Sequence, residues 1–129
     1  LTLDAYCQAR HLLVSFSGRP WGFVDEALQT LGRERRIVLT VNQFFTGARV
    51  AAESDLLSVM PRHFIHSMGV AEGLVERDLP MSVPLVHVDA LWHRRQQGAP
   101  AHGWLRDTLV RAAADAYARS LREYALPYG

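Results

Sequence analysis

The residues of this chain that could carry out chemistry are few, and they form no recognised catalytic pattern. Ser17, Asp89 and His93 are the residue types of a nucleophilic triad, but no serine lies in the glycine-flanked turn that exposes such a nucleophile. His63 and His66 are three residues apart on a predicted helix, yet no further ligand at metal-binding spacing accompanies them. The sequence therefore predicts no enzymatic activity, no metal and no other cofactor.

Two short polar loops are stronger candidates for ligand binding. Each follows an apolar, β-rich run and precedes a predicted helix, so each presents unpaired backbone N–H groups and a partial positive charge. That combination favours a carboxylate or a similar anion. The candidate residues of the first loop are Ser15 and Ser17, and those of the second are Gln43, Phe44 and Phe45.

Both loops leave an alternative open. Ser17 could simply cap a helix or turn the chain. Phe44 or Phe45 would give a ligand an aromatic wall, although an aromatic ring beside a sheet is also a common core residue. The residue types alone do not decide between these interpretations.

The loops belong to an alternating strand and helix pattern. The predicted strands are residues 11–16, 36–41 and 55–60, and the predicted helices are residues 20–31, 45–53 and 61–67. This order is typical of a parallel α/β sheet, which binds its ligands beyond the carboxyl ends of its strands. Thr2 is a predicted cap for a short helical turn before the first strand.

The second half of the chain has a different pattern. Residues 74–79 predict a short edge strand, residues 86–92 alternate as a strand does, and residues 100–124 predict a long helix. A strand without a neighbouring sheet leaves an unpaired edge. We therefore expect self-association, with a partner strand from another copy.

Composition and charge exclude several classes of protein. Cys7 is the only cysteine, which rules out an internal disulfide and fits a cytoplasmic location. The longest apolar runs fall far short of the roughly 20 residues of a membrane helix, and the start lacks the layout of a signal peptide. The 14 cationic residues, all arginine, are mixed with 13 anionic ones, so the chain has no basic face for nucleic acid.

Three runs along the chain together resemble one bacterial family. They are Ser17–Gly18 with VDEAL and LG after it, SDL followed by Pro61, and LWHRR followed by PAHGWLR. From residue 1 to about residue 113, the chain resembles the effector-binding domain of LysR-type transcriptional regulators. That resemblance implies an α/β fold of the periplasmic-binding-protein type (type II), with two subdomains joined by crossing strands and the ligand between them.

The resemblance also implies a division of the chain. Residues 1–10 would be the tail of a crossover or hinge, and residues 11–79 the second effector-binding subdomain. Residues 80–129 would be the return crossover, the return strand and the C-terminal helix of the first subdomain. A complete regulator also carries an N-terminal helix-turn-helix, so DNA binding is expected only through a part outside these 129 residues.

The function implied is that of a noncatalytic sensor. It would bind a small acidic or aromatic metabolite in the cleft between subdomains and so modulate DNA binding and transcription. Because a fold does not fix function, a solute-binding module or a small α/β enzyme of the same architecture is the alternative. A third interpretation is an oligomerising domain without a ligand.

The resemblance bears on three candidate residues, His11, Gln43 and Trp92. His11 matches a position that lines the cleft in some relatives, although a lone histidine is often simply hydrogen bonded. Gln43 stands where many similar proteins have the histidine of a Pro-His-Phe run, so a neutral amide replaces an imidazole. Trp92 would lie near the cleft or the hinge, where packing is the competing role.

Overall fold

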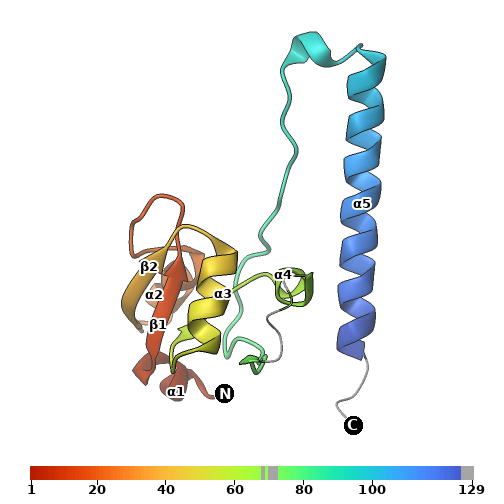
Figure 1. Ribbon diagram of the computed structural model, residues 1–129. Coiled ribbons are helices and arrows are strands. Elements are labelled where there is room, and N and C mark those ends of the chain that lie inside the picture. The colour runs from red at the N-terminus through yellow and green to blue at the C-terminus, as the bar shows by residue number, and fades with distance from the viewer. Residues whose placement is uncertain (68, 70–72, 126–129) are drawn as a thin grey trace. The chain divides into compact units, whose positions relative to one another are not determined.

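The chain forms two compact units, Leu1–Leu85 and Val86–Gly129. The structure is a computed structural model that describes residues 1–67, 69 and 73–125, and for residues 63, 66, 67 and 120–125 it describes the backbone alone. The first unit holds the sheet, and the second holds a long helix (Figure 1).

The first unit is built on a parallel three-stranded sheet with the order β2-β1-β3. β1 (Arg10–Val14) pairs along its whole length with β2 (Arg36–Val41), so the predicted strand at residues 36–41 is confirmed. β3 (Leu57–Ser58) is shorter than the predicted strand at residues 55–60, because it pairs with β1 only beside His11 and Leu12.

The helix before β1 and the helix after it begin at residues that hydrogen bonds define. α1 (Leu3–Gln8) is capped as predicted, since the Thr2 hydroxyl accepts a hydrogen bond from the backbone N–H of Ala5. α2 (Phe23–Thr30) begins three residues later than predicted, so the expected start at Pro20 is wrong. The Asp25 carboxylate accepts a hydrogen bond of 2.8 Å from the N–H of Gly22, which fixes Gly22 as the residue before the helix.

Helices cover both faces of the sheet (Figure 1). Neighbouring residues of a strand point to opposite faces. On one face, the His11 ring contacts Tyr6 of α1, and Tyr6 is buried in a cluster with Val24 and Leu28 of α2. On the other face, Leu12 lies under Gly47 of α3.

The helices that follow β2 and β3 in the chain are short. α3 (Phe44–Ala52) begins one residue before the predicted start and lies against β1, and α4 (Arg62–Ser67) follows β3. Gly69 follows α4 with φ of +65°, a left-handed conformation that suits glycine and that agrees with the predicted helix end.

Residues 74–83 run from one core cluster to the other instead of forming a strand. Leu74 packs against Ala48 and Ile65, whereas Leu79, Met81 and Val83 pack against the cluster of Tyr6, Val24 and Leu28. The predicted edge strand at residues 74–79 is therefore wrong. Side chains hold this segment, since Arg62 forms ion pairs with Glu76 (3.2 Å) and Asp78 (2.9 Å).

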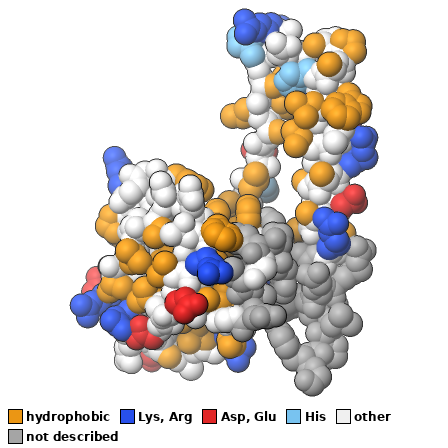
Figure 2. Space-filling view, viewed as in Figure 1, with side chains coloured by type: hydrophobic (Ala, Val, Ile, Leu, Met, Phe, Trp, Pro, Cys, Tyr) orange, Lys and Arg blue, Asp and Glu red, His pale blue; other side chains and the backbone are white. Residues whose placement is uncertain are grey.

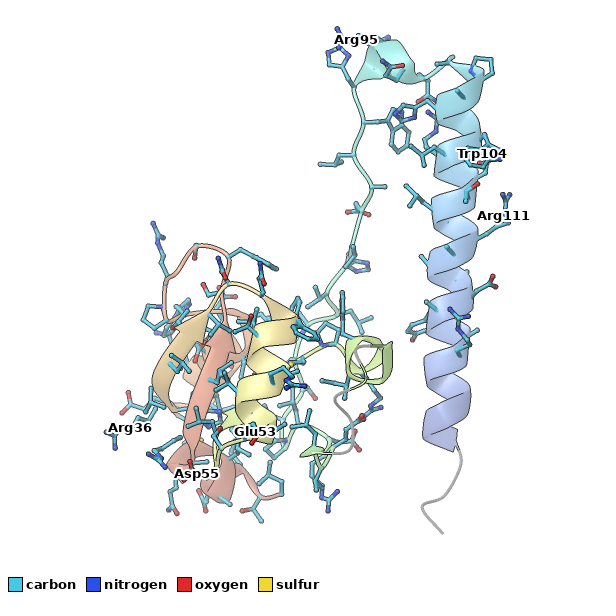
Figure 3. All side chains as sticks on the ribbon, in the orientation of Figure 1. Arg36, Glu53, Asp55, Arg95, Trp104 and Arg111 are labelled. Atoms are coloured by element: carbon cyan, nitrogen blue, oxygen red, sulfur yellow. The ribbon has the colours of Figure 1, made fainter. Side chains whose placement is uncertain are left out.

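The second unit contains a 3₁₀ turn, η2 (Arg94–Gln96), and the predicted long helix, α5 (Pro100–Ala125). The predicted strand at residues 86–92 is wrong, and Val88 and Leu91 are 91% and 94% exposed. A strand needs a partner for its backbone hydrogen bonds, and the described residues of this unit include no other strand. Apolar side chains consequently gather on the surface of this unit, among them Trp104, which projects from α5 (Figures 2 and 3).

The close packing between α3 and the sheet leaves no room for a side chain at Gly47. A Cβ added there would lie 2.9 Å from Val14 Cγ2 and 3.0 Å from Met60 Cε. We expect Gly47→Ala to destabilise the protein by about 1–3 kcal/mol through overpacking, although alanine favours helix. Urea unfolding measures the change.

The matched control is Gly103→Ala in α5, where the nearest atom, an Arg106 guanidinium nitrogen, is 3.7 Å from the added Cβ. That variant should be neutral or stabilising, because only helix propensity changes. Equal stability of the Gly47→Ala protein and the wild type would contradict the packing argument.

Candidate functional site

The carboxyl edge of the sheet brings the two candidate loops together. β1 and β2 are neighbouring parallel strands, so the residues that follow them lie at the same edge. The backbone N–H of Ser15 donates to the Val41 carbonyl over 2.8 Å, which ties the start of the first loop to the end of β2. The hydroxyls of Ser15 and Ser17 are 3.2 Å apart, and Ser15 is buried.

The second loop leads into a helix whose first turn has no side-chain cap. Gln43 is the residue before α3, in extended conformation, and its side chain accepts no hydrogen bond from the first N–H groups of that helix. The first turn of α3 also lacks an acidic residue. Its N–H groups and the positive end of its dipole therefore face the carboxyl edge uncompensated by side chains.

The first loop does not lead into an equivalent helix terminus. α2 carries Asp25 and Glu26 in its first turn, and the Asp25 carboxylate is itself bonded to the N–H of Gly22. The prediction that both helix starts favour an anion is therefore wrong for α2. Its carboxylates already compensate the dipole.

Aromatic rings connect the loops and α4. The rings of Phe16 and Phe44 meet edge to face with centroids 5.9 Å apart, and those of Phe44 and Phe64 stack at 5.2 Å. Phe16 is 78% exposed and Phe45 is 53% exposed. Phe16 and Phe64 were missed in the sequence, although the place of Phe16 between the two serines was a usable signal. Phe45 belongs to neither core cluster of buried residues.

His11 lies away from these loops, in the core between the sheet and α1. Its Nε2 is 2.7 Å from the Tyr6 carbonyl oxygen, and its ring meets the Tyr6 ring with centroids 4.5 Å apart. The side chain is fully buried, and among the described residues its Nδ1 has no hydrogen-bond partner. The hydrogen-bonded role weighed in the sequence is the one seen here, and contact with a ligand stays a prediction.

Trp92 belongs to the second unit, and the contacts described for it lie within that unit. Its indole N–H donates to the Gln97 side-chain oxygen over 2.7 Å, and the Arg106 guanidinium lies 4.9 Å from the centre of its ring. These contacts join the turn at η2 to the start of α5. A cation over an indole is a favourable arrangement, so Trp92 has a structural role here, and its ligand role stays a prediction.

The residue types of a triad are not brought together within one unit. Ser17 lies in the first unit, whereas Asp89 and His93 lie in the second, where the His93 Nδ1 accepts a hydrogen bond from the N–H of Arg95. The side chains of His63 and His66 lie outside the described residues. Among the residues that are described, no three histidine, cysteine or acidic side chains are grouped as metal ligands, and no helix is long and apolar enough to cross a membrane.

The family is decided by a match over most of the chain. The model of the LysR substrate binding domain matches residues 1–114. The chain belongs to this family. The resemblance seen in the sequence is thereby confirmed, and so is the α/β fold of the type II periplasmic-binding-protein kind.

Curated relatives of this LysR domain are transcription regulators. The HTH-type transcriptional activator NagR of Ralstonia sp is 26% identical over 116 residues, which cover 90% of this chain. The HTH-type transcriptional activator NahR of Pseudomonas putida is 28% identical over 115 residues, or 89% of this chain. In both cases the chain spans 38% of the length of the relative.

The solved structures that resemble this chain are also those of transcription regulators. The regulatory domain of MexT, a transcriptional activator in Pseudomonas aeruginosa, is 36% identical and superposes with a TM-score of 0.66 over 84% of this chain and 55% of its own. A probable transcriptional regulator from the same organism is 26% identical, with a TM-score of 0.59 over 64% of this chain and 28% of its own. By name, these relatives are all regulators of transcription.

The burial of His11 gives a prediction on pH. Burial has the largest effect and lowers the pKa of the His11 imidazole. The hydrogen bond to the Tyr6 carbonyl raises this pKa, the Arg35 charge lowers it, and the Asp25 charge raises it. The unfolded chain, with a histidine pKa of about 6.5, then binds the proton more readily than the folded one. The contribution of His11 to the free energy of unfolding should be fully present above about pH 6.5 and should decline as the pH falls below that value. Denaturant unfolding between pH 8 and pH 5 checks this.

The control for that experiment is His11→Gln, whose amide can still donate to the Tyr6 carbonyl but does not titrate. The variant should be less stable overall and show a shallower decline with acid. An identical slope in both proteins would mean that other groups cause the acid sensitivity.

Proposed function

We propose that this chain is the effector-sensing region of a LysR-type transcription regulator, and that its ligand is a small metabolite with a carboxylate. The observation that carries the proposal is the uncapped first turn of α3, which follows β2 at the same carboxyl edge of the sheet as the loop that holds Ser15 and Ser17. Membership of the LysR substrate-binding family supports a ligand at this edge.

The chemistry of the edge suits an acid with an apolar or aromatic body. A carboxylate there would accept hydrogen bonds from the N–H groups of the first turn of α3 and from a serine hydroxyl. The exposed Phe16 ring and the Phe44 ring would contact the body of the ligand. Gln43 would contribute a neutral amide, which can donate to a carboxylate without adding charge.

The proposed mechanism is a shift between two arrangements of the subdomains. We assign residues 11–79 to the second subdomain, residues 1–10 to the hinge, and residues 80–129 to the first subdomain. Within the last range, residues 86–92 form no strand in this chain and would do so only on pairing with a sheet. A ligand that binds one arrangement better than the other moves the population toward it. Such a difference in affinity is what couples a metabolite to a DNA-binding region elsewhere in the same protein.

Two properties of the whole protein belong to the same proposal. DNA would be bound through an N-terminal region, as the HTH-type names of the relatives suggest, and the regulator would work in the cytoplasm. Self-association of this chain is also proposed, because residues 85, 86, 88 and 91 expose apolar side chains on an extended segment. Such a segment is stabilised when it joins a sheet.

A thermal melt against a panel of aromatic and aliphatic carboxylates tests the proposed ligand class. A ligand at about one hundred times its Kd should stabilise the protein by about 2.7 kcal/mol, which a domain of this size reports as a rise in Tm of several degrees. Matched alcohols and amides of the same compounds are the control. Rises that do not depend on the carboxylate would contradict an anion site at α3.

Gln43→Ala tests the loop itself. The Gln43 side chain makes no capping hydrogen bond, so its removal should barely change the Tm of the free protein. Binding of the carboxylate that gives the largest shift should weaken by roughly tenfold, as expected for loss of a hydrogen bond to a charged group worth about 1.5 kcal/mol. Isothermal titration calorimetry measures the Kd, and Gln29→Ala on the exposed side of α2 is the control. An unchanged Kd would remove Gln43 from the site.

A further inference from the structure

A chain of part-buried hydrogen bonds leads from the end of the β1–α2 loop to α1. It starts at the N–H of Gly22, which donates to the Asp25 carboxylate over 2.8 Å. The same carboxylate receives two hydrogen bonds from the Arg35 guanidinium, of 2.8 and 2.9 Å. A third guanidinium hydrogen bond, of 3.1 Å, goes to the Tyr6 hydroxyl. The Tyr6 carbonyl in turn accepts from His11 if Nε2 carries the proton.

The three side chains of this chain of bonds expose little surface to water. The Arg35 and Asp25 side chains are 1% and 7% exposed, and Tyr6 is 2% exposed. Water therefore cannot readily replace a partner that moves away, and a bidentate arginine–carboxylate pair has a single well-defined geometry. A displacement at one end changes the partners available at the other.

The two ends belong to segments with different proposed roles. Gly22 is the last residue of the loop that contains Ser15 and Ser17, whereas Tyr6 lies in α1, within residues 1–10 of the proposed hinge. No other described hydrogen bond or ion pair of α1 reaches this loop or α2. The exposed ion pair between Asp4 and Arg33 joins α1 to the turn before β2, where the Arg33 N–H donates to the Leu28 carbonyl at the opposite end of α2 from Gly22.

We propose that the hydrogen-bonded chain Gly22–Asp25–Arg35–Tyr6 couples the order of the β1–α2 loop to the order of α1. A ligand that orders the loop would then also hold α1 in place, which would pass the binding event to the hinge. The role assigned to the hinge rests on the proposed function, whereas the coupling itself involves no ligand. Asp25, Arg35 and Tyr6 are positioning residues in this proposal.

The experiment is amide hydrogen exchange on the ligand-free chain, with Tyr6→Phe as the variant. This change removes one hydroxyl, keeps the buried ring and leaves the Asp25–Arg35 pair in place. Exchange should become roughly fivefold faster in α1 and also at residues 19–25, since a net hydrogen bond worth about 1 kcal/mol is lost. Exchange in α3 reports global stability, and it should change by a smaller factor.

Asp4→Ala is the matched control, because it removes the exposed ion pair that also ties α1 to the turn before β2. It should leave exchange at residues 19–25 at the wild-type rate. Faster exchange of α1 alone in Tyr6→Phe would overturn the proposal, and so would an equal acceleration of α1, the loop and α3. Because no ligand is present, failure of carboxylate binding would count against the proposed function without affecting this result.

Discussion

The buried ion pair between Asp25 and Arg35 is the interaction on which the arrangement of the first unit depends. Asp25 sets the start of α2 through the N–H of Gly22, and Arg35 is placed directly before β2 while it holds the Tyr6 hydroxyl of α1. Desolvating two charges costs several kcal/mol each, and the pair offsets this through its bidentate geometry and through the further hydrogen bonds to the Tyr6 hydroxyl and from the Gly22 N–H. Loss of either partner would leave a buried charge uncompensated, at a cost of about 3–5 kcal/mol.

The same pair explains why the two loops at the carboxyl edge differ. Both follow a strand of one parallel sheet, and both lead into a helix, so their local sequences suggest equal affinity for an anion. The carboxylate that binds Arg35 also occupies the start of α2, whereas the start of α3 carries no acidic side chain. The candidate anion site is therefore one-sided, because only the start of α3 at this edge has no acidic side chain in its first turn.

The second unit shows what a strand-forming sequence does without a partner. Residues 86–92 have the alternation of a half-buried strand, yet they form none and leave Val88 and Leu91 almost fully exposed. α5 forms regardless, because a helix satisfies its own backbone hydrogen bonds. The turn before it is held locally by Trp92, Gln97 and Arg106. Local hydrogen bonds and ring contacts therefore account for η2 and α5, the two elements of this unit.

The sequence by itself determined the features that depend on near neighbours. Periodicity predicted β2 and α5, the Thr2 hydroxyl predicted the start of α1, and the helix predicted at residues 20–31 ends within one residue of Thr30, the last residue of α2. The family runs predicted the fold class, which the match over residues 1–114 confirmed.

Only the tertiary structure decided the features that depend on distant residues. Arg35 meets Asp25 across 10 positions and Tyr6 across 29, and Phe16 and Phe64 meet Phe44 from separate elements. No local pattern records which of several polar or aromatic side chains will be buried together. For that reason the start of α2, the burial of His11, the aromatic contacts and the missing strand at residues 86–92 emerged only in the folded chain.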